Sequence, residues 1–92
     1  LAVAEPVRGA DGSYAVDLSW DANTEQDLAG YVVYRQDAGG DVRRVSNSLL
    51  PAPAFHDEWL KAGRSYMYSV SAVDKSGNES RRGAAVDVSV TP

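Results

Sequence analysis

The sequence has 92 residues, a length that supports one domain with a single hydrophobic core. It contains no cysteine, which excludes disulfides and thiolate metal sites, and no apolar stretch approaches the ~20 residues of a membrane-spanning helix. The formal net charge of −4, with both signs mixed along the chain, argues against nucleic acid or an anionic membrane surface as a partner. We therefore expect residues 1–92 to form one domain that is not inserted directly into a membrane.

The first predicted elements are two strands. Residues 1–3 indicate a first strand, which we expect to be truncated at its N-terminal end because the chain begins at Leu1 without a methionine. The second strand, at 13–20, has the clearest pattern, because large apolar side chains occupy every second position from Tyr14 to Trp20. Alternation with a period of two is typical of a strand that is buried on one face.

Five further strands follow, separated by turn signals at Gly39-Gly40 and Ser76-Gly77-Asn78. They are expected at 31–35, 42–45, 54–57, 65–74 and 84–91. No segment has a helical period long enough to count. Seven short strands at regular spacing predict an all-β antiparallel sandwich or barrel.

Several residues, in this order and spacing, resemble a fibronectin type III domain along nearly the whole chain. Leu18-Ser19-Trp20 resembles the end of the family's second strand, with its buried tryptophan, and residues 30–35 resemble its third strand. The family's turn into the sixth strand is resembled by Phe55-His56-Asp57 followed by Leu60, Gly63 and Tyr66.

The resemblance implies a seven-stranded antiparallel sandwich of the fibronectin type III, or immunoglobulin-like, class. It gives structural roles to Trp20, Leu60, Gly63 and Tyr66. In particular, it implies that the hydroxyl of Tyr66 bonds back to upstream backbone, as in the tyrosine corner of sandwich folds.

Few residues of the sequence are candidates for catalysis or metal binding. His56 lies beside two carboxylates, but the chain has no second histidine or cysteine to complete a zinc site or a nucleophile–base pair. Asp21, Asn23, Glu25 and Asp27 alternate as in a calcium loop, yet Gln26 and Val32 stand where such a loop requires glycine and a carboxylate. We therefore predict that the chain is no enzyme and has no catalytic, cofactor-binding or metal-binding residue.

A candidate interaction surface rests on apolar side chains that alternation places on an outer face. They are Val32, Tyr34, Met67 and Val73. By contrast, the outward positions of the strand at 13–20 are small or polar, so the two outer faces differ. Trp59 should point away from Leu60, and either caps the open end of the sandwich or adds a contact. The alternative is that these are ordinary exposed apolar residues.

Two functional interpretations follow. The resemblance implies an extracellular tandem-module setting, so the first is a non-catalytic spacer or positioning module of a secreted or surface-anchored multidomain protein of bacterial type. Its partners are then neighbouring domains of the same chain, its location is extracellular, cell-surface or periplasmic, and it is a monomer. The second is a binding module for a protein domain or a polysaccharide. Because Tyr34 is the one ring clearly on the outer face, we favour protein over polysaccharide.

Overall fold

The structure, a computed structural model, describes residues 2–8, 14–21, 27–37, 40–46, 48–60, 63–83 and 85–90. Seven strands lie in these segments: β1 Ala2–Arg8, β2 Tyr14–Trp20, β3 Leu28–Asp37, β4 Val42–Arg44, β5 Ala54–Leu60, β6 Arg64–Asp74 and β7 Val86–Val90. None of the described residues forms a helix, so none forms an apolar helix long enough to cross a membrane.

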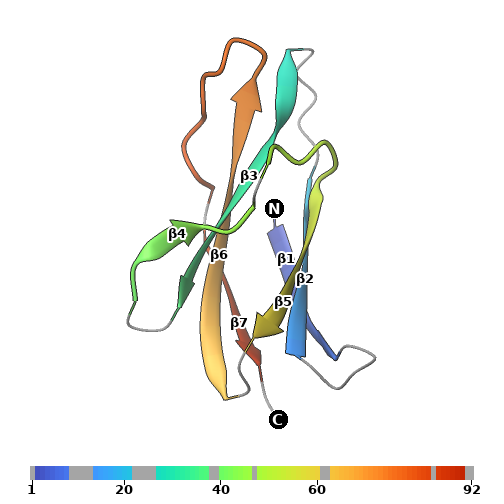
Figure 1. Ribbon diagram of the computed structural model, residues 1–92, viewed down its shortest axis with the longest axis vertical. Coiled ribbons are helices and arrows are strands. Elements are labelled where there is room, and N and C mark those ends of the chain that lie inside the picture. Colours follow the sequence, from blue (N-terminus) through green and yellow to red (C-terminus); the bar gives the residue numbers. More distant parts are fainter. Residues whose placement is uncertain are drawn as a thin grey trace.

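The strands form two sheets that face each other (Figure 1). One has three strands in the order β1-β2-β5, and the other has four in the order β4-β3-β6-β7. Every pairing is antiparallel. This confirms the predicted all-β sandwich with seven antiparallel strands and excludes the barrel alternative.

The first strand is longer than predicted. β1 pairs with β2 along its whole length, from Ala2 opposite Trp20 to Arg8 opposite Tyr14, so the expectation of a short strand at 1–3 is wrong. Pro6 weakens the strand pattern in the sequence because proline has no backbone N–H to donate. It is tolerated here because β1 is an edge strand with a partner on one side only.

The core lies between the sheets and is built from alternate residues of the strands. Its buried cluster contains Val16, Leu18, Val33, Leu60, Tyr66, Tyr68, Val88 and Val90. Five strands from both sheets contribute to it, so neither sheet buries its apolar face alone. Complete burial of a side chain such as Leu18 stabilises the fold by about 1.5–3 kcal/mol.

Trp20 lies at the margin of this core, half-buried rather than fully buried as the sequence predicted. Its indole packs edge-on against the ring of Tyr31, with the centroids 5.3 Å apart. The indole N–H is buried and has no hydrogen-bond partner among the described residues.

The corner between β5 and β6 contains three residues with predicted structural roles. Leu60 and Tyr66 are both buried in the core cluster. Gly63 has a φ of +80°, and its N–H donates to the carbonyl of Val90 at 2.6 Å, which joins the corner to the end of β7. The backbone acceptor implied for the Tyr66 hydroxyl stays a prediction, because residues 61 and 62 lie outside the described part of the chain.

Replacing Gly63 by alanine should cost about 1–2 kcal/mol of unfolding free energy, because a Cβ is unfavourable in this left-handed conformation. The added Cβ would meet no atom within 4 Å, so the cost is conformational rather than steric. Gly83 is the matched control: its φ is not in this region, and an added Cβ would lie 3.8 Å from the nearest atom, the carbonyl oxygen of Val70. Urea unfolding should separate the two variants, and equal losses would contradict the argument.

Candidate interaction surface

Val32 lies on the outer side of β3, as alternation predicts, but it is only 2% exposed. Two features cover this part of the face. Leu49 and Leu50 run close over Gly30, where an added Cβ would lie 2.9 Å from the Cβ of Leu49. Opposite Val32 on β6, Ser71 is also buried and is covered by Glu79. The prediction that Val32 belongs to an exposed surface is therefore wrong.

Tyr34 belongs to a polar network rather than to an apolar patch. Its hydroxyl and that of Ser71 both donate to the same carboxylate oxygen of Glu79, the latter at 2.6 Å. The hydrogen bond to Glu79 raises the pKa of Tyr34, and the bonds from Ser71 and Tyr34 lower the pKa of Glu79. At neutral pH the network therefore consists of the neutral phenol of Tyr34 donating to the ionised carboxylate of Glu79.

An open hollow of about 630 Å³ lies beside this network. Its lining comes from β3, β6 and the segment between β6 and β7: Tyr34, Ser69, Glu79, Ser80, Arg81, Arg82 and Gly83. The guanidinium of Arg82 lies over the ring of Tyr34, 5.2 Å from its centroid. The hollow is thus lined mainly by charged and polar side chains.

The other three residues of the predicted surface, Met67, Val73 and Trp59, do not form one exposed patch among the described side chains. Met67 is 39% exposed, and Val42, at 41%, lies in the same cross-strand row with Gln36 between them. Val73 is half-buried and is bridged to Glu79. Trp59 belongs to β5, but its side chain lies outside what the structure describes. The exposed apolar area among the described residues of this face is therefore smaller than predicted.

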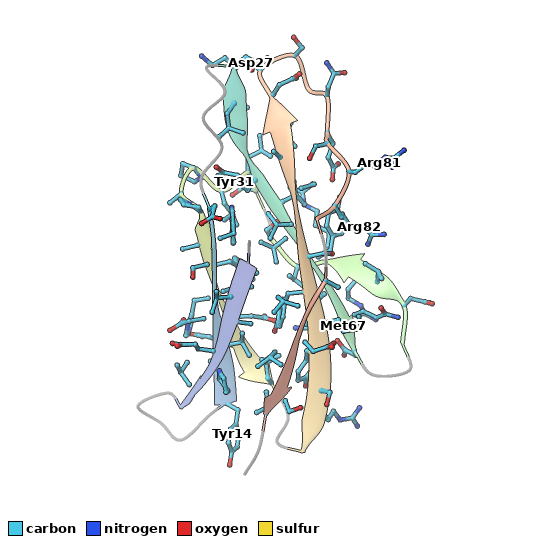
Figure 2. All side chains as sticks on the ribbon, turned by 180° about the vertical axis from the view of Figure 1, so that it is seen from behind. Tyr14, Asp27, Tyr31, Met67, Arg81 and Arg82 are labelled. Carbon is cyan, nitrogen blue, oxygen red and sulfur yellow. The ribbon has the colours of Figure 1, made fainter. Side chains whose placement is uncertain are left out.

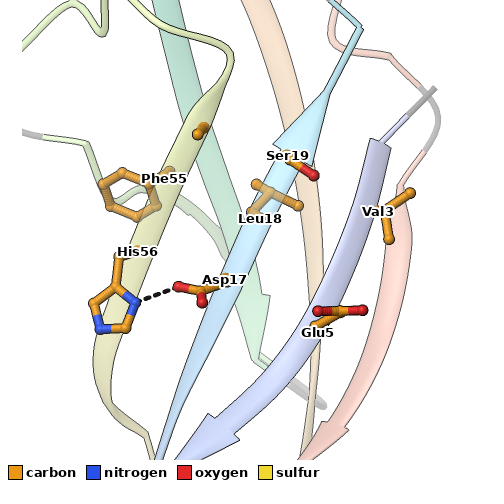
Figure 3. A pocket seen from close by; sticks show the side chains of 8 residues that line it. Val3, Glu5, Asp17, Leu18, Ser19, Phe55 and His56 are labelled. Atoms are coloured by element: carbon orange, nitrogen blue, oxygen red, sulfur yellow. Dashed lines mark hydrogen bonds and ion pairs between the residues drawn. The ribbon is translucent and has the colours of Figure 1, made fainter. Parts of the chain in front are cut away.

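The outer face of the three-stranded sheet is acidic (Figure 3). His56 contacts Asp17 through Nδ1 and Glu58 through Nε2, the latter at 3.1 Å, and Asp17 lies opposite Glu5 of β1. A hollow of about 500 Å³ lies among these strands. The His56 side chain is 46% exposed, which confirms that it points to solvent. No group of three or more potential metal ligands occurs in the described residues.

His56 should make the stability of the protein depend on pH. Its pKa is raised, chiefly by the hydrogen bond with Asp17, so protonated His56 stabilises the fold. This contribution is complete below the unfolded pKa of about 6.5 and is lost as the pH rises through the higher folded value. Because the pair is exposed, we expect at most about 1 kcal/mol.

Urea unfolding of the wild type and His56→Gln at about pH 5.5 and about pH 8.5 measures this effect. The wild type should be the more stable protein at the lower pH, and the difference should shrink at the higher pH. A difference of equal size at both values would contradict a role for the imidazolium.

A third polar cluster lies between the sheets. Asp57 of β5 is 8% exposed, and its Oδ2 accepts from Arg35 Nη1 at 2.9 Å and from the Tyr68 hydroxyl at 2.6 Å. Arg35 also donates to Asp37 and lies over the ring of Tyr66. Burial, followed by the bond to Asp57, raises the pKa of Tyr68 far above its ordinary value. These contacts bind one sheet to the other.

Comparison with solved structures identifies the architecture. A fibronectin type III-like protein from Clostridium thermocellum superposes with a TM-score of 0.72 over 98% of this chain and 90% of that one, at 23% sequence identity. The chain has the fibronectin type III fold. No family model matches the sequence.

Two curated relatives are large enzymes. An amylopullulanase of Thermoanaerobacterium saccharolyticum is 35% identical over 74 residues, which are 80% of this chain and 6% of the relative. A poly(3-hydroxybutyrate) depolymerase of Ralstonia pickettii is 38% identical over 77 residues, which are 84% of this chain and 14% of the relative. The matched segment thus corresponds to a small part of each relative.

Sequence reasoning missed the Arg35–Asp57–Tyr68 cluster and the arginines around Tyr34. The first had a usable signal: if His56 points outward, alternation places Asp57 inward, where a carboxylate requires a buried partner. The second had none, because Arg81 and Arg82 lie in a stretch that the sequence presents only as a connection between strands.

Proposed function

We propose that this chain is a non-catalytic positioning module of a multidomain extracellular protein. The observation that carries the proposal is that segments similar to this chain occur in two enzymes with different named activities. One is named for an activity on a glucan and the other for the depolymerisation of a polyester, and the segment spans 6% and 14% of their lengths. A segment common to enzymes with unrelated substrates is best explained by a role other than their chemistry.

The internal contacts support the same proposal. The side chains best suited to acid–base chemistry already contact other side chains of the module. His56 contacts Asp17 and Glu58. Asp57 binds Arg35 and Tyr68. A network closed on itself favours a structural role over the binding and release of protons from a substrate.

A rigid module should fix the distance between the domains on either side of it. The chain measures 42 × 28 × 22 Å, whereas a flexible Gly/Ser linker of the same length would have a root-mean-square end-to-end distance of about 50 Å with a broad distribution. Placed between two fluorescent reporter domains, the module should give one narrow distance distribution. A distribution as broad as that of the linker would contradict the positioning role.

The proposal that the module is non-catalytic has its own test. The purified chain should release no product from pullulan or from poly(3-hydroxybutyrate), with an active enzyme on each polymer as the control. Product formation by the module would contradict the proposal. The extracellular part is supported by the family resemblance, and protease added to intact cells should remove the module from its parent protein.

The proposed partners are neighbouring domains of the same chain, and we propose that the module itself is a monomer. The observation favouring a protein contact is the row formed by Val42 and Met67, which are 41% and 39% exposed. Sedimentation of the isolated chain should give a monomer. In the distance measurement above, Met67→Ser should broaden the distribution if this row touches a neighbouring domain.

A further inference from the structure

Three arginines converge on one part of the outer face of the four-stranded sheet. Arg44 of β4 lies directly opposite Tyr34, and Arg82 lies over the ring of that tyrosine. Arg81 lines the hollow of about 630 Å³ beside Tyr34. All three arginines are exposed. Figure 2 shows Arg81 and Arg82 extending from the segment beside β6 away from the sandwich.

The charge of this arginine cluster is opposite in sign to the net charge of the protein. The net charge is −4, yet the hollow is lined by Arg81 and Arg82 against the single carboxylate of Glu79, and Arg44 lies opposite Tyr34, which also lines it. The opposite outer face bears Glu5, Asp17 and Glu58, of which Asp17 and Glu58 flank His56. Asp87 also lies on the face with the arginines, opposite Met67, so the positive charge is local to the hollow, where it attracts an anionic ligand.

Two of the guanidinium groups are available to a ligand. Among the described residues, the guanidinium of Arg81 has no hydrogen-bond or ion-pair partner, and that of Arg82 makes only the ring contact with Tyr34 and a weaker attraction to Glu79. Stacking on the ring orients the planar fork of Arg82 before a ligand arrives, which lowers the cost of binding. Such forks match carboxylates through paired hydrogen bonds.

The rest of the lining favours a saccharide over an acidic protein as the ligand. One oxygen of Glu79 accepts from Tyr34 and Ser71, while its other oxygen has no partner in the described part of the chain. That oxygen would repel the carboxylates of an acidic peptide but would accept hydrogen bonds from sugar hydroxyls. Arginine forks beside an acceptor oxygen therefore fit a ligand that carries both carboxylate and hydroxyl groups.

We propose that this hollow binds a carboxylated polysaccharide, with Arg81 and Arg82 on a sugar carboxylate, Glu79 on sugar hydroxyls and Arg44 adding attraction. The site goes beyond the positioning role and does not depend on it, so either can fail alone. It also revises the preference drawn from sequence, because the recognition rests on charge rather than on several aromatic rings.

Titration calorimetry with oligomers of polygalacturonate tests the proposal. Binding should be lost when the carboxylates are methyl-esterified, because the sugar backbone is then unchanged and only the charge is removed. It should weaken by about 10-fold in Arg82→Ala, the loss of a charge-assisted pair. Arg82→Lys should restore part of the affinity, since the charge returns without the planar fork.

Arg43→Ala is the matched control. Arg43 lies on the same strand as Arg44 and is also exposed, but it pairs with Arg35 and therefore faces the other side of the sheet. Its removal should change the affinity by less than about 2-fold. Equal losses in Arg43→Ala and Arg82→Ala, no binding of polygalacturonate, or equal binding of polyglutamate would each overturn the proposal.

Discussion

Replacing Asp57 by alanine should lower the free energy of unfolding by about 3–4 kcal/mol, since breaking a buried ion pair leaves an uncompensated charge. The Arg35 side chain is 17% exposed and that of Asp57 is 11% exposed, so water screens the pair only partly. The same substitution removes the acceptor of the Tyr68 hydroxyl, which lies in the middle of the core. Urea unfolding followed by circular dichroism measures the loss.

Asp37 provides the control for this prediction. It binds the same guanidinium through Nε at 2.9 Å, but its side chain is 40% exposed. Asp37→Ala should therefore cost no more than about 1 kcal/mol. Tyr68→Phe, which leaves the Arg35–Asp57 pair in place, should cost about 1 kcal/mol for one lost hydrogen bond. If Asp57→Ala proved as mild as these two variants, the cluster would not bind the sheets together.

Trp20→Ala should cost about 3 kcal/mol, the lower end of the range for a large aromatic residue, because Trp20 is only half-buried. The loss combines the apolar area of the indole with its edge-on contact to Tyr31, which contributes about 0.5–1.5 kcal/mol. Unfolding followed by far-ultraviolet circular dichroism is the suitable measurement, because the substitution changes the fluorescence.

Trp20→Phe separates packing from hydrogen bonding. Phenylalanine keeps a ring against Tyr31 and removes a buried N–H that has no partner among the described residues. We expect a change within about 1 kcal/mol, because the lost packing is offset by removal of an unsatisfied polar group. A loss as large as that of the alanine variant would show that the N–H is bonded in solution.

Strand positions were predictable where alternation was strong. From Tyr14 to Trp20 the pattern fixed both the strand and its buried face, and the residues around Tyr66 and Tyr68 did the same for β6. Prediction was poorer for β1, because the register of an edge strand containing Pro6 depends on its pairing with β2 more than on its own pattern.

The candidate site was predictable only in part, for a similar reason. Alternation correctly placed Val32 and Tyr34 on the outer side of β3, but it says nothing about what covers an outer face. Leu49, Glu79 and Arg82 come from connecting segments whose course depends on the whole chain.

The sequence by itself therefore determined the all-β architecture, the inward residues of β2 and β6, and the solvent position of His56, because these follow from a local period of two. Only the tertiary structure decided that Val32 is buried, that Asp57 meets Arg35 across the sandwich, and that arginines gather around Tyr34. Each of these depends on contacts between residues far apart in the chain. Such contacts are selected by the packing of the sheets and loops as a whole, which no local pattern encodes.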